Sequence, residues 1–214
     1  MPPSCRAAAV PCEVAAGGAA RTSAGRRADG NGEQRRIGVP PSAHDRGDRP
    51  PGASRCDPSL TLVVCGAPLA SRAADVRDSL VDRWSVSVVV SGAAGQWCAV
   101  PTTVERPRPD TVVACPLTFN SADKVVAGIM DTPATGVLCD AIGAGAPIVA
   151  VPMVNDRLWG HPVWASTLRD LRAAGVRMID VRTGEVGTPR AVVSGTGPDV
   201  VGAFQVSRVI DALG

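Results

Sequence analysis

The chain has 214 residues, of which 45% are hydrophobic, enough for one domain with a sizeable core. Its formal net charge is only +2, and no basic run is interleaved with aromatic residues, so the sequence argues against nucleic acid or a membrane surface as a partner. Because it has no tyrosine and only two phenylalanines, we expect a core of Val, Ala, Leu and Ile.

The first quarter of the chain differs in composition from the rest. Residues 1–58 are crowded with Ala, Gly, Pro, Ser and Arg and lack the apolar periodicity of a core-facing element. We therefore predict a disordered tail over 1–58 and a single domain over 59–214. The mixed charge of the tail does not match a transit peptide, and a start codon placed too far upstream is an alternative explanation.

From Leu60 onward, short β-branched runs alternate with segments of helical spacing. This order is typical of a parallel sheet with helices on both faces, so we predict a doubly wound, Rossmann-like (flavodoxin-like) α/β fold. The predicted strands are residues 60–65, 85–90, 111–115, 146–151, 176–181 and 190–194, and the predicted helices are residues 69–83, 121–131, 134–145, 161–175 and about 198–213.

The seven cysteines form no C-x-x-C pair and no cluster at zinc-ligand spacing, so no metal site is predicted. Cys65, Cys115 and Cys139 lie in apolar, strand-like contexts that favour reduced, buried thiols. Since the count is odd and no signal peptide is evident, we expect a cytoplasmic protein.

In a sheet of this kind, ligands bind beyond the carboxyl ends of the strands. Four loops at that edge carry small, hydroxyl and amide groups. Gly66, in the first loop, allows a tight turn before a helix whose free N–H groups can hold a phosphate, although an ordinary strand-to-helix turn explains that loop equally well. A hydrolase elbow G-x-S-x-G and a Walker A loop are both absent from the sequence.

Two of these loops resemble motifs of a known family, the homo-oligomeric flavin-containing cysteine decarboxylases, which include phosphopantothenoylcysteine decarboxylase and lantibiotic peptidyl-cysteine decarboxylases. Residues 116–124 read PLTFNSADK and are similar to the family's P-A-S/T-A-N-T with a lysine four residues after the asparagine. Residues 152–159 read PMVNDRLW and are similar to P-x-M-N-x-x-M-W, with Val154 and Leu158 in place of methionines. A looser match to T-x-x-A-x-x-F involves Ser91, Ala94 and Trp97.

The resemblance, which covers roughly residues 60–181, implies an FMN-binding enzyme that assembles as a trimer or a trimer-based oligomer. In the family reaction, flavin oxidises a cysteine to a thioaldehyde, whose C=S group accepts electrons while carbon dioxide leaves. Asn120 would hold a substrate carboxylate, and Asn155 is the second predicted catalytic residue. The predicted cofactor-binding residues are Gly66, Ser71 and Ser91 near the phosphate, Pro116, Thr118 and Asn120 around the ring, and Lys124.

The sequence also departs from the family. The segment before the third strand lacks the family's catalytic histidine, which leaves Cys98 and Glu105 as weak replacements. The A-C-G-D-like motif of the branch that reduces its enethiol is replaced by VVSGTG at residues 192–197. We therefore expect a small-molecule or peptide substrate with a carboxylate, and a C-terminal peptide cysteine rather than phosphopantothenoylcysteine. The alternative is an FMN-binding protein without decarboxylase chemistry that serves as a redox or binding partner.

Several of these residues have structural explanations as well. Asn120 could cap the helix that contains Lys124, the only lysine in the chain, and the ammonium could meet Asp131 or a neighbouring subunit. His161, which precedes a proline at a predicted helix start, suits a structural hydrogen bond better than a base. Trp159 and Trp164 suit the core or a subunit contact better than ligand stacking.

Overall fold

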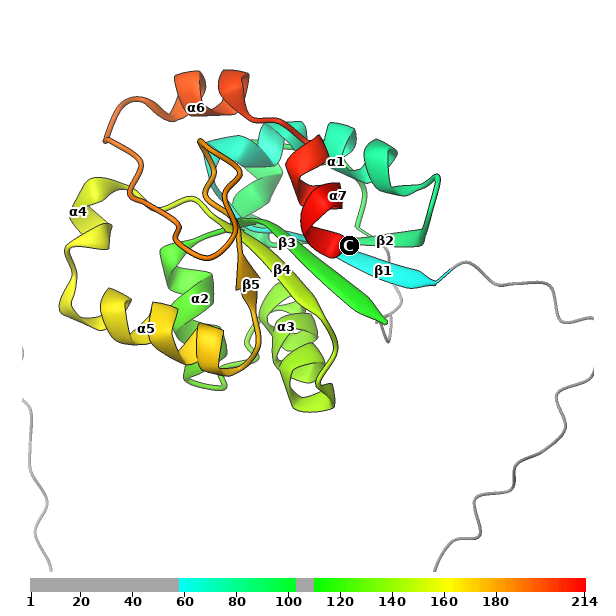
Figure 1. Cartoon of the computed structure of the whole chain (residues 1–214), viewed down its shortest axis with the longest axis horizontal. Helices are drawn as coiled ribbons and strands as arrows, with labels where there is room; N and C mark the ends of the chain where they lie inside the picture. The colour runs from blue at the N-terminus through cyan, green and yellow to red at the C-terminus, as the bar shows by residue number, and fades with distance from the viewer. Residues whose placement is uncertain (1–57, 103–109) are drawn as a thin grey trace, which may run out of the picture. The chain divides into compact units, whose positions relative to one another are not determined.

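The computed structural model describes residues 58–102 and 110–214 (Figure 1). The predicted tail lies outside these ranges except for Pro58, and so does Glu105, one of the two candidate bases.

Within the described residues, five parallel strands form one sheet, in the spatial order β2-β1-β3-β4-β5 (Figure 1). The order reverses between β1 and β3, because the chain first adds β2 on one side of β1 and then places all later strands on the other side. The predicted doubly wound α/β fold is confirmed. The strands are β1 (Ser59–Val64), β2 (Ser85–Val90), β3 (Thr111–Leu117), β4 (Ile148–Pro152) and β5 (Arg177–Met178).

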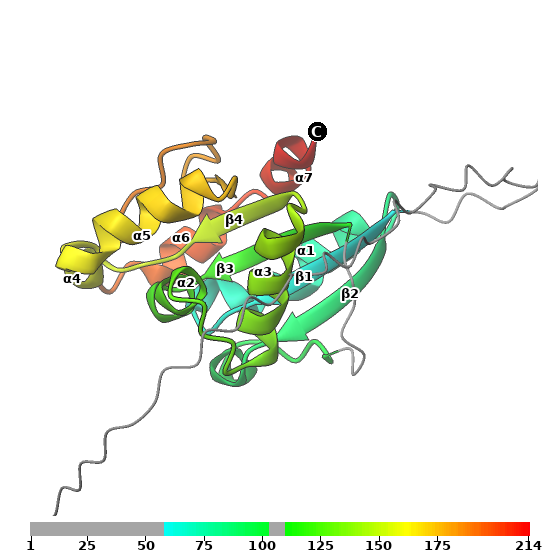
Figure 2. The same cartoon turned by 90° about the horizontal axis from the view of Figure 1, so that it is seen from below.

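Helices cover both faces of the sheet (Figures 1 and 2). One face carries η1 (Pro68–Arg72), α1 (Ala73–Leu80), η2 (Gly92–Gln96), α6 (Gly197–Ala203) and α7 (Ser207–Leu213). The other carries α2 (Phe119–Val126), α3 (Pro133–Ala144) and α5 (Pro162–Ala173), and the short α4 (Asp156–Trp159) follows β4 at the carboxyl edge.

The strands are buried on both faces, as expected for a parallel sheet. Along β1, Leu60 and Leu62 enter one core and Val63 enters the other, and each is at most 1% exposed. This alternation follows from the two-residue repeat of a strand. Each such side chain contributes about 1.5–3 kcal/mol on burial, so the strands supply a large part of the stabilisation of both cores.

The connection between α2 and α3 breaks where the sequence predicts. Thr132 is the N-cap of α3, and its hydroxyl accepts from the backbone N–H of Thr135, whose own hydroxyl accepts from the N–H of Thr132. Pro133 occupies the first helical position, where its missing N–H has no intrahelical partner to lose. At the other end, Gly145 stops α3 with a φ of 67°.

The predicted strand at 190–194 is wrong. Val192 makes only an isolated bridge to Asn155, in the loop after β4, because its N–H donates to Val154 O at 2.9 Å. The preceding turn is built around the buried Asp180, whose carboxylate accepts from the backbone N–H groups of Thr183 and Arg190. The segment therefore joins the carboxyl edge instead of adding a sixth strand.

The predicted helix over 198–213 is two helices, α6 and α7. Phe204 separates them with an extended backbone, φ −66° and ψ 126°, and its ring is buried in the core. The break turns the chain so that the ring and the apolar side of α7 can both reach the sheet.

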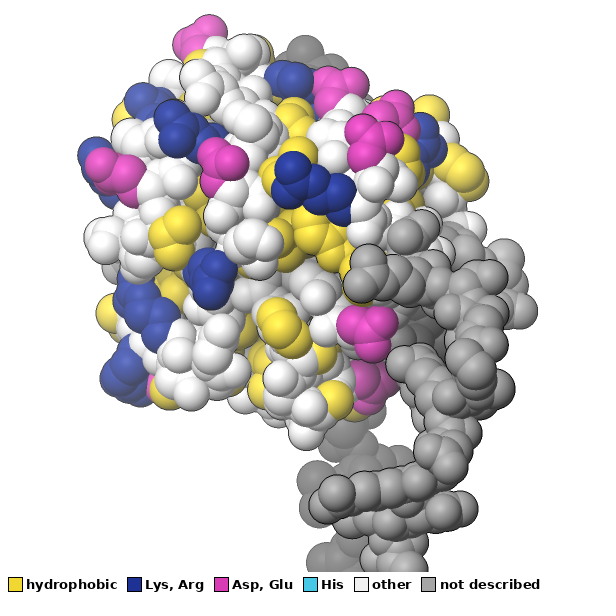
Figure 3. All heavy atoms as spheres, turned by 45° about the vertical axis from the view of Figure 1, so that its right-hand side comes forward, with side chains coloured by type: hydrophobic (Ala, Val, Ile, Leu, Met, Phe, Trp, Pro, Cys, Tyr) yellow, Lys and Arg dark blue, Asp and Glu magenta, His cyan; other side chains and the backbone are white. Residues whose placement is uncertain are grey.

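The face shown in Figure 3 carries Lys and Arg side chains interspersed with Asp and Glu, without a large field of one sign. Over residues 58–102 and 110–214, no helix combines the length and the hydrophobicity needed to cross a membrane.

Candidate functional site

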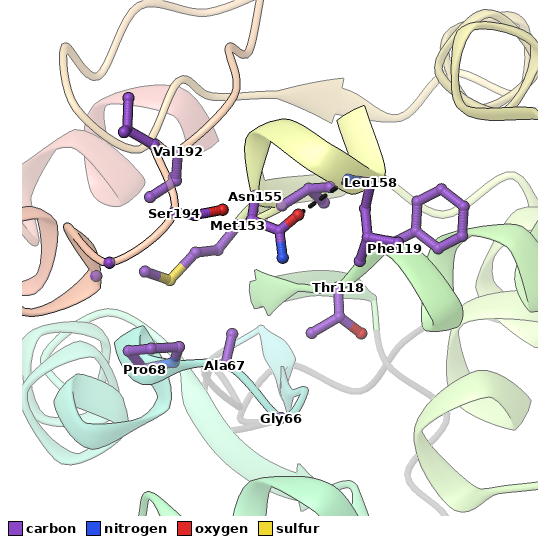
Figure 4. A pocket seen from close by; sticks show the side chains of 14 residues that line it. Gly66, Ala67, Pro68, Thr118, Phe119, Met153, Asn155, Leu158, Val192 and Ser194 are labelled. Carbon is purple, nitrogen blue, oxygen red and sulfur yellow. Dashed lines mark hydrogen bonds between the residues drawn. The ribbon is translucent and has the colours of Figure 1, made fainter. Parts of the chain in front are cut away.

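A cavity of about 410 Å³ opens at the carboxyl ends of β1, β3 and β4 (Figure 4). Its lining comes from four segments that are far apart in the sequence: the loop after β1, the start of α2, the loop after β4 and the stretch that precedes α6. The residues that line it are Gly66, Ala67, Pro68, Thr118, Phe119, Met153, Val154, Asn155, Leu158, Val192, Val193, Ser194, Gly195 and Gly197.

Gly66 is where the loop after β1 meets the loop after β2. A Cβ atom at this position would lie 2.6 Å from Ala93 Cβ and 2.7 Å from Ala93 O. These distances are shorter than van der Waals contact, and part of the neighbouring group is backbone. Only glycine therefore lets η2 pack against the turn after β1.

Thr118 is the N-cap residue of α2 and lies on the cavity wall. Its hydroxyl donates to Ser121 Oγ at 3.1 Å, which leaves oxygen lone pairs on Thr118 as acceptors. Behind this pair lies Cys65, whose thiol pKa is raised by burial and pulled back in part by hydrogen bonds from the Ser121 hydroxyl and the Thr118 N–H. Cys65 is therefore a neutral thiol that packs behind Thr118 and Ser121.

The buried cysteines match the sequence interpretation. Cys65 and Cys115 are both free and buried, and Cys139 is free and partly buried. Burial raises the pKa of Cys115 to about 12, with a smaller contribution from neighbouring Cys65. A thiolate nucleophile is therefore not expected at either of these two positions near neutral pH.

Asn155, in the loop after β4, lines a second side of the cavity. Its Oδ1 accepts from the Leu158 N–H at 2.9 Å, which makes it the N-cap of α4. The amide nitrogen points into the cavity (Figure 4). Because the oxygen is already engaged, Asn155 presents a hydrogen-bond donor to any ligand.

Residues 192–197 form another side of the cavity and reach Pro68, in the loop after β1, at Gly197. The Asp156 N–H donates to Val192 O at 2.9 Å, and Asp156 Oδ1 accepts from the Ser194 N–H at 3.1 Å and from the Ser194 hydroxyl. The Ser194 hydroxyl bond is also the largest cause of the lowered pKa of Asp156. Sequence reasoning missed Ser194, because it interpreted 190–194 as a strand; the Gly-rich stretch that follows was the available signal of a loop.

The lining is almost entirely apolar. Among the described residues around the cavity, no side chain is charged, and the polar side chains are Thr118, Asn155 and Ser194. Met153 is buried and lies between the loops, with its sulfur 3.4 Å from the Leu69 N–H that donates to it. An uncharged, largely apolar space of this volume suits a flat ring system with a few polar edges.

Three of the predicted site residues, Gly66, Thr118 and Asn155, line the cavity, and the others are not part of its lining. The Ser71 hydroxyl donates to Pro68 O at 2.9 Å on the exposed side of η1. Pro116 is buried in β3, where its carbonyl accepts from the Cys65 N–H at 3.1 Å.

Asn120 and Lys124 both lie on α2 beyond the cavity wall. The prediction that Asn120 caps this helix is wrong, because Thr118 occupies the N-cap position and Asn120 is an exposed residue of the first turn. Lys124 Nζ lies 2.5 Å from Asp131 Oδ2, so the expected contact with Asp131 is present.

Ser91 tests whether the site suits a phosphate. Its N–H donates to Val64 O at 2.9 Å, and its hydroxyl is buried without a hydrogen-bond partner in the described part of the chain. A buried hydroxyl without a partner is destabilising in the free protein. A phosphate oxygen placed beside the loop after β2 would satisfy it, so the residues present fit a phosphorylated ligand.

The aromatic side chains near the cavity pack on one another beside the core. The Phe119 ring points away from the cavity, and its centroid lies 5.5 Å from that of His161 and 5.4 Å from that of Trp164 (Figure 4). His161 is the N-cap of α5, with Nδ1 accepting from the Val163 N–H at 3.3 Å, and Trp164 is 1% exposed. The structural interpretations of His161 and Trp164 are thereby confirmed.

The chain is similar to known flavoproteins over the segment that contains most of the cavity lining. The sequence profile of the family described as Flavoprotein matches residues 99–198, a segment that contains both motif regions and the loop of Ser194. The predicted family resemblance is confirmed. A curated relative, the coenzyme A biosynthesis bifunctional protein CoaBC of Thermococcus kodakarensis, is 35% identical over 75 residues. That match covers 35% of this chain and only 18% of the relative's length.

Solved structures share the fold. A PPC decarboxylase mutant superposes with a TM-score of 0.57 at 16% identity, over 73% of this chain and 95% of its own. The FMN-dependent cysteine decarboxylase SpaF superposes with a TM-score of 0.53 at 20% identity, over 74% of this chain and 99% of its own. At these identities the superpositions establish the shared fold.

Proposed function

We propose that this chain binds FMN in the cavity at the carboxyl edge of the sheet and acts as a flavin-dependent decarboxylase on a cysteine-containing substrate, with a C-terminal peptide cysteine as the preferred group. The observation that carries the proposal is the meeting of the two motif segments on one uncharged cavity, through Thr118 and Asn155. The Flavoprotein match contains the lining residues from Thr118 to Gly197, and SpaF, which shares the fold, is an FMN-dependent cysteine decarboxylase.

The residues present divide into two environments that match the two ends of FMN. The apolar lining around Ala67, Met153 and Val192 suits the ring, and the unpartnered hydroxyl of Ser91 in the loop after β2 suits the phosphate. When bound, FMN supplies a two-electron oxidant that the side chains of the protein lack.

The chain's own residues bind, orient and exclude water. The Asn155 amide donates to an acceptor on the bound molecule, and the Thr118 oxygen accepts from a donor there. Residues 192–197 form one side of the cavity, next to Asn155. Asn120, exposed at the start of α2, remains the proposed contact for a substrate carboxylate beyond the ring.

A specific observation favours the second candidate, an FMN-binding protein without decarboxylase chemistry. None of the described residues that line the cavity has a side chain that titrates near neutral pH, so the lining supplies no base for a substrate thiol. Cys98 is partly buried and packs against the core on the η1 side, away from the lining. Under this reading the protein would serve as a redox or binding partner.

One incubation separates the two candidates. Flavin-loaded protein is mixed with a peptide that ends in cysteine, and with a matched peptide that ends in serine. Decarboxylation predicts a loss of about 46 mass units, carbon dioxide plus two hydrogens, from the cysteine peptide alone. A protein that retains flavin but leaves both peptides unchanged supports the second candidate and overturns the first.

We also propose that the chain assembles with copies of itself, as a trimer or a trimer-based oligomer, and works in the cytoplasm. Ile129 and Met130, in the connection between α2 and α3, are 45% and 49% exposed, and apolar side chains of this size at a surface favour a protein contact. Sedimentation of the purified protein tests the proposal, because a monomer at micromolar concentration would contradict it.

A further inference from the structure

Ser194 has an unusually constrained hydroxyl for a residue at the mouth of a cavity. Its O–H donates to Asp156 Oδ1, and its backbone N–H donates to the same oxygen at 3.1 Å. Asp156 Oδ1 also accepts from the Arg157 N–H at 3.1 Å, so the carboxylate is itself held in place. Because a hydroxyl has a single proton, Ser194 Oγ can offer only lone pairs to the cavity.

Asn155 supplies the complementary group on the same side of the cavity. The isolated bridge between Asn155 and Val192 places the two segments side by side, and both side chains turn toward the cavity (Figure 4). The Asn155 oxygen is engaged by the Leu158 N–H, so its amide faces the cavity as a donor. Within the cavity, a fixed donor and a fixed acceptor therefore stand on neighbouring segments.

A ligand that satisfies both groups must present an acceptor beside a donor on one edge. Cyclic imides and lactams do so, because ring closure holds the C=O and N–H of –C(=O)–NH– on the same side. A trans peptide bond points them in opposite directions. The remaining lining near this pair, Val192, Val193 and Leu158, is apolar and suits a ring more than a polyol chain.

We propose that Ser194 is a specificity-determining residue that, together with Asn155, binds the N–H/C=O edge of a cyclic imide. The inference rests on the proposed FMN function and specifies how the ring lies in the cavity. The oxidised isoalloxazine ring has one N–H, at N3, between two carbonyls. The proposal therefore places this end of the ring against residues 192–197. Asp156 is a positioning residue, since it acts only by holding the Ser194 hydroxyl.

The test measures affinity, not turnover. The full-length protein is stripped of flavin and titrated with FMN and with FMN methylated at N3, following quenching of flavin fluorescence. The wild type is expected to bind the methylated compound at least about tenfold more weakly, the equivalent of one lost hydrogen bond. Ser194→Ala should bind FMN about tenfold more weakly and should discriminate between the two ligands by no more than about threefold.

Three controls separate a specific role from general damage. Ser194→Thr keeps the hydroxyl and should retain the discrimination. Ser166→Ala removes a serine hydroxyl from α5, where it donates to Val163 O, and should match the wild type. The pair lumiflavin and 3-methyllumiflavin lacks the ribityl chain, so equal discrimination with this pair assigns the effect to the ring.

The outcomes are distinct. If the wild type binds FMN and N3-methyl FMN equally, or if Ser194→Ala keeps the full penalty, this assignment fails while the proposed FMN function stands. If the lumiflavin pair shows no discrimination, the ring on its own is not recognised through its N3–H, and this result would also overturn the assignment. If folded wild-type protein binds neither compound, both the proposed function and this inference fail.

Discussion

Lys124 Nζ lies 2.5 Å from Asp131 Oδ2 and joins the last turn of α2 to the start of α3. The ammonium is the largest cause of the lowered pKa of the Asp131 carboxyl. Both side chains are partly exposed, at 27% and 45%, so solvent screens the ion pair and it contributes little to folding. Its main effect is to hold the connection that carries the exposed Ile129 and Met130.

We expect Lys124→Ala to lower flavin retention or oligomer assembly, because the connection between α2 and α3 loses its ion pair. The matched control is Arg169→Ala, which removes an exposed arginine that pairs with neighbouring Asp170. The flavin-to-protein ratio after purification and the sedimentation profile measure the effect. Identical values in the two variants would show that the lysine has no special part in the site.

Gly66→Ala should destabilise the domain by about 1–3 kcal/mol, because the new Cβ would lie 2.6 Å from Ala93 Cβ and force η2 away. Gly95→Ala is the control, since a Cβ there meets nothing within 4 Å. Urea unfolding of the three proteins checks the prediction. A Gly66→Ala variant as stable as Gly95→Ala would contradict the close packing of the first two loops.

Ser91→Ala should separate stability from binding. In the free protein, removal of a buried hydroxyl without a partner should leave the free energy of unfolding unchanged or raise it by about 1 kcal/mol. FMN affinity should fall, because the phosphate loses a donor. Thermal unfolding with and without FMN measures both effects. A variant that is destabilised when free and binds FMN normally would remove Ser91 from the phosphate site.

The Asp156 carboxylate predicts an acid-sensitive loop. Its folded-state pKa lies below the ordinary value, chiefly because of the Ser194 hydroxyl, so its stabilising contribution is complete above the unfolded pKa of about 4. The contribution is lost as pH falls through the folded pKa. We expect the wild type to lose more stability than Asp156→Asn as the pH falls from about 5 to about 3. This range brackets the ordinary titration of an aspartate carboxyl.

Urea midpoints for both proteins across that pH range provide the measurement. Asp110 and Asp131 also have lowered pKa values, so the wild type alone would mix three titrations, and the difference between the two proteins isolates Asp156. Parallel pH profiles would mean that the carboxylate makes no net contribution through Ser194.

Most of the sheet could be predicted because its strands are short, β-branched runs bounded by polar or glycine-containing segments. The stretch 190–194 has the same local composition as a strand, and its local pattern could not reveal that the Val192 N–H is taken by Val154 O. The break at Phe204 could not be predicted either, because an apolar residue at helical spacing does not indicate that a helix ends there.

The lining of the cavity could be predicted where a residue follows a strand directly. Gly66, Thr118 and Asn155 each lie at or just past a carboxyl end, where topology alone brings them together. Ser194 was missed because its position depends on a long-range carboxylate contact, 38 residues away in the sequence. Asn120 and Lys124 are not among the residues that line the cavity, and their predicted contacts with substrate and cofactor stay predictions.

Titration of folded, flavin-free protein with FMN is the most direct test of the account. We predict saturable binding of one FMN per chain and a rise in the unfolding temperature. The bound flavin should have absorption maxima at about 370 and 450 nm. Correctly folded protein whose unfolding temperature and FMN spectrum both stay unchanged on mixing would contradict the proposed flavin site.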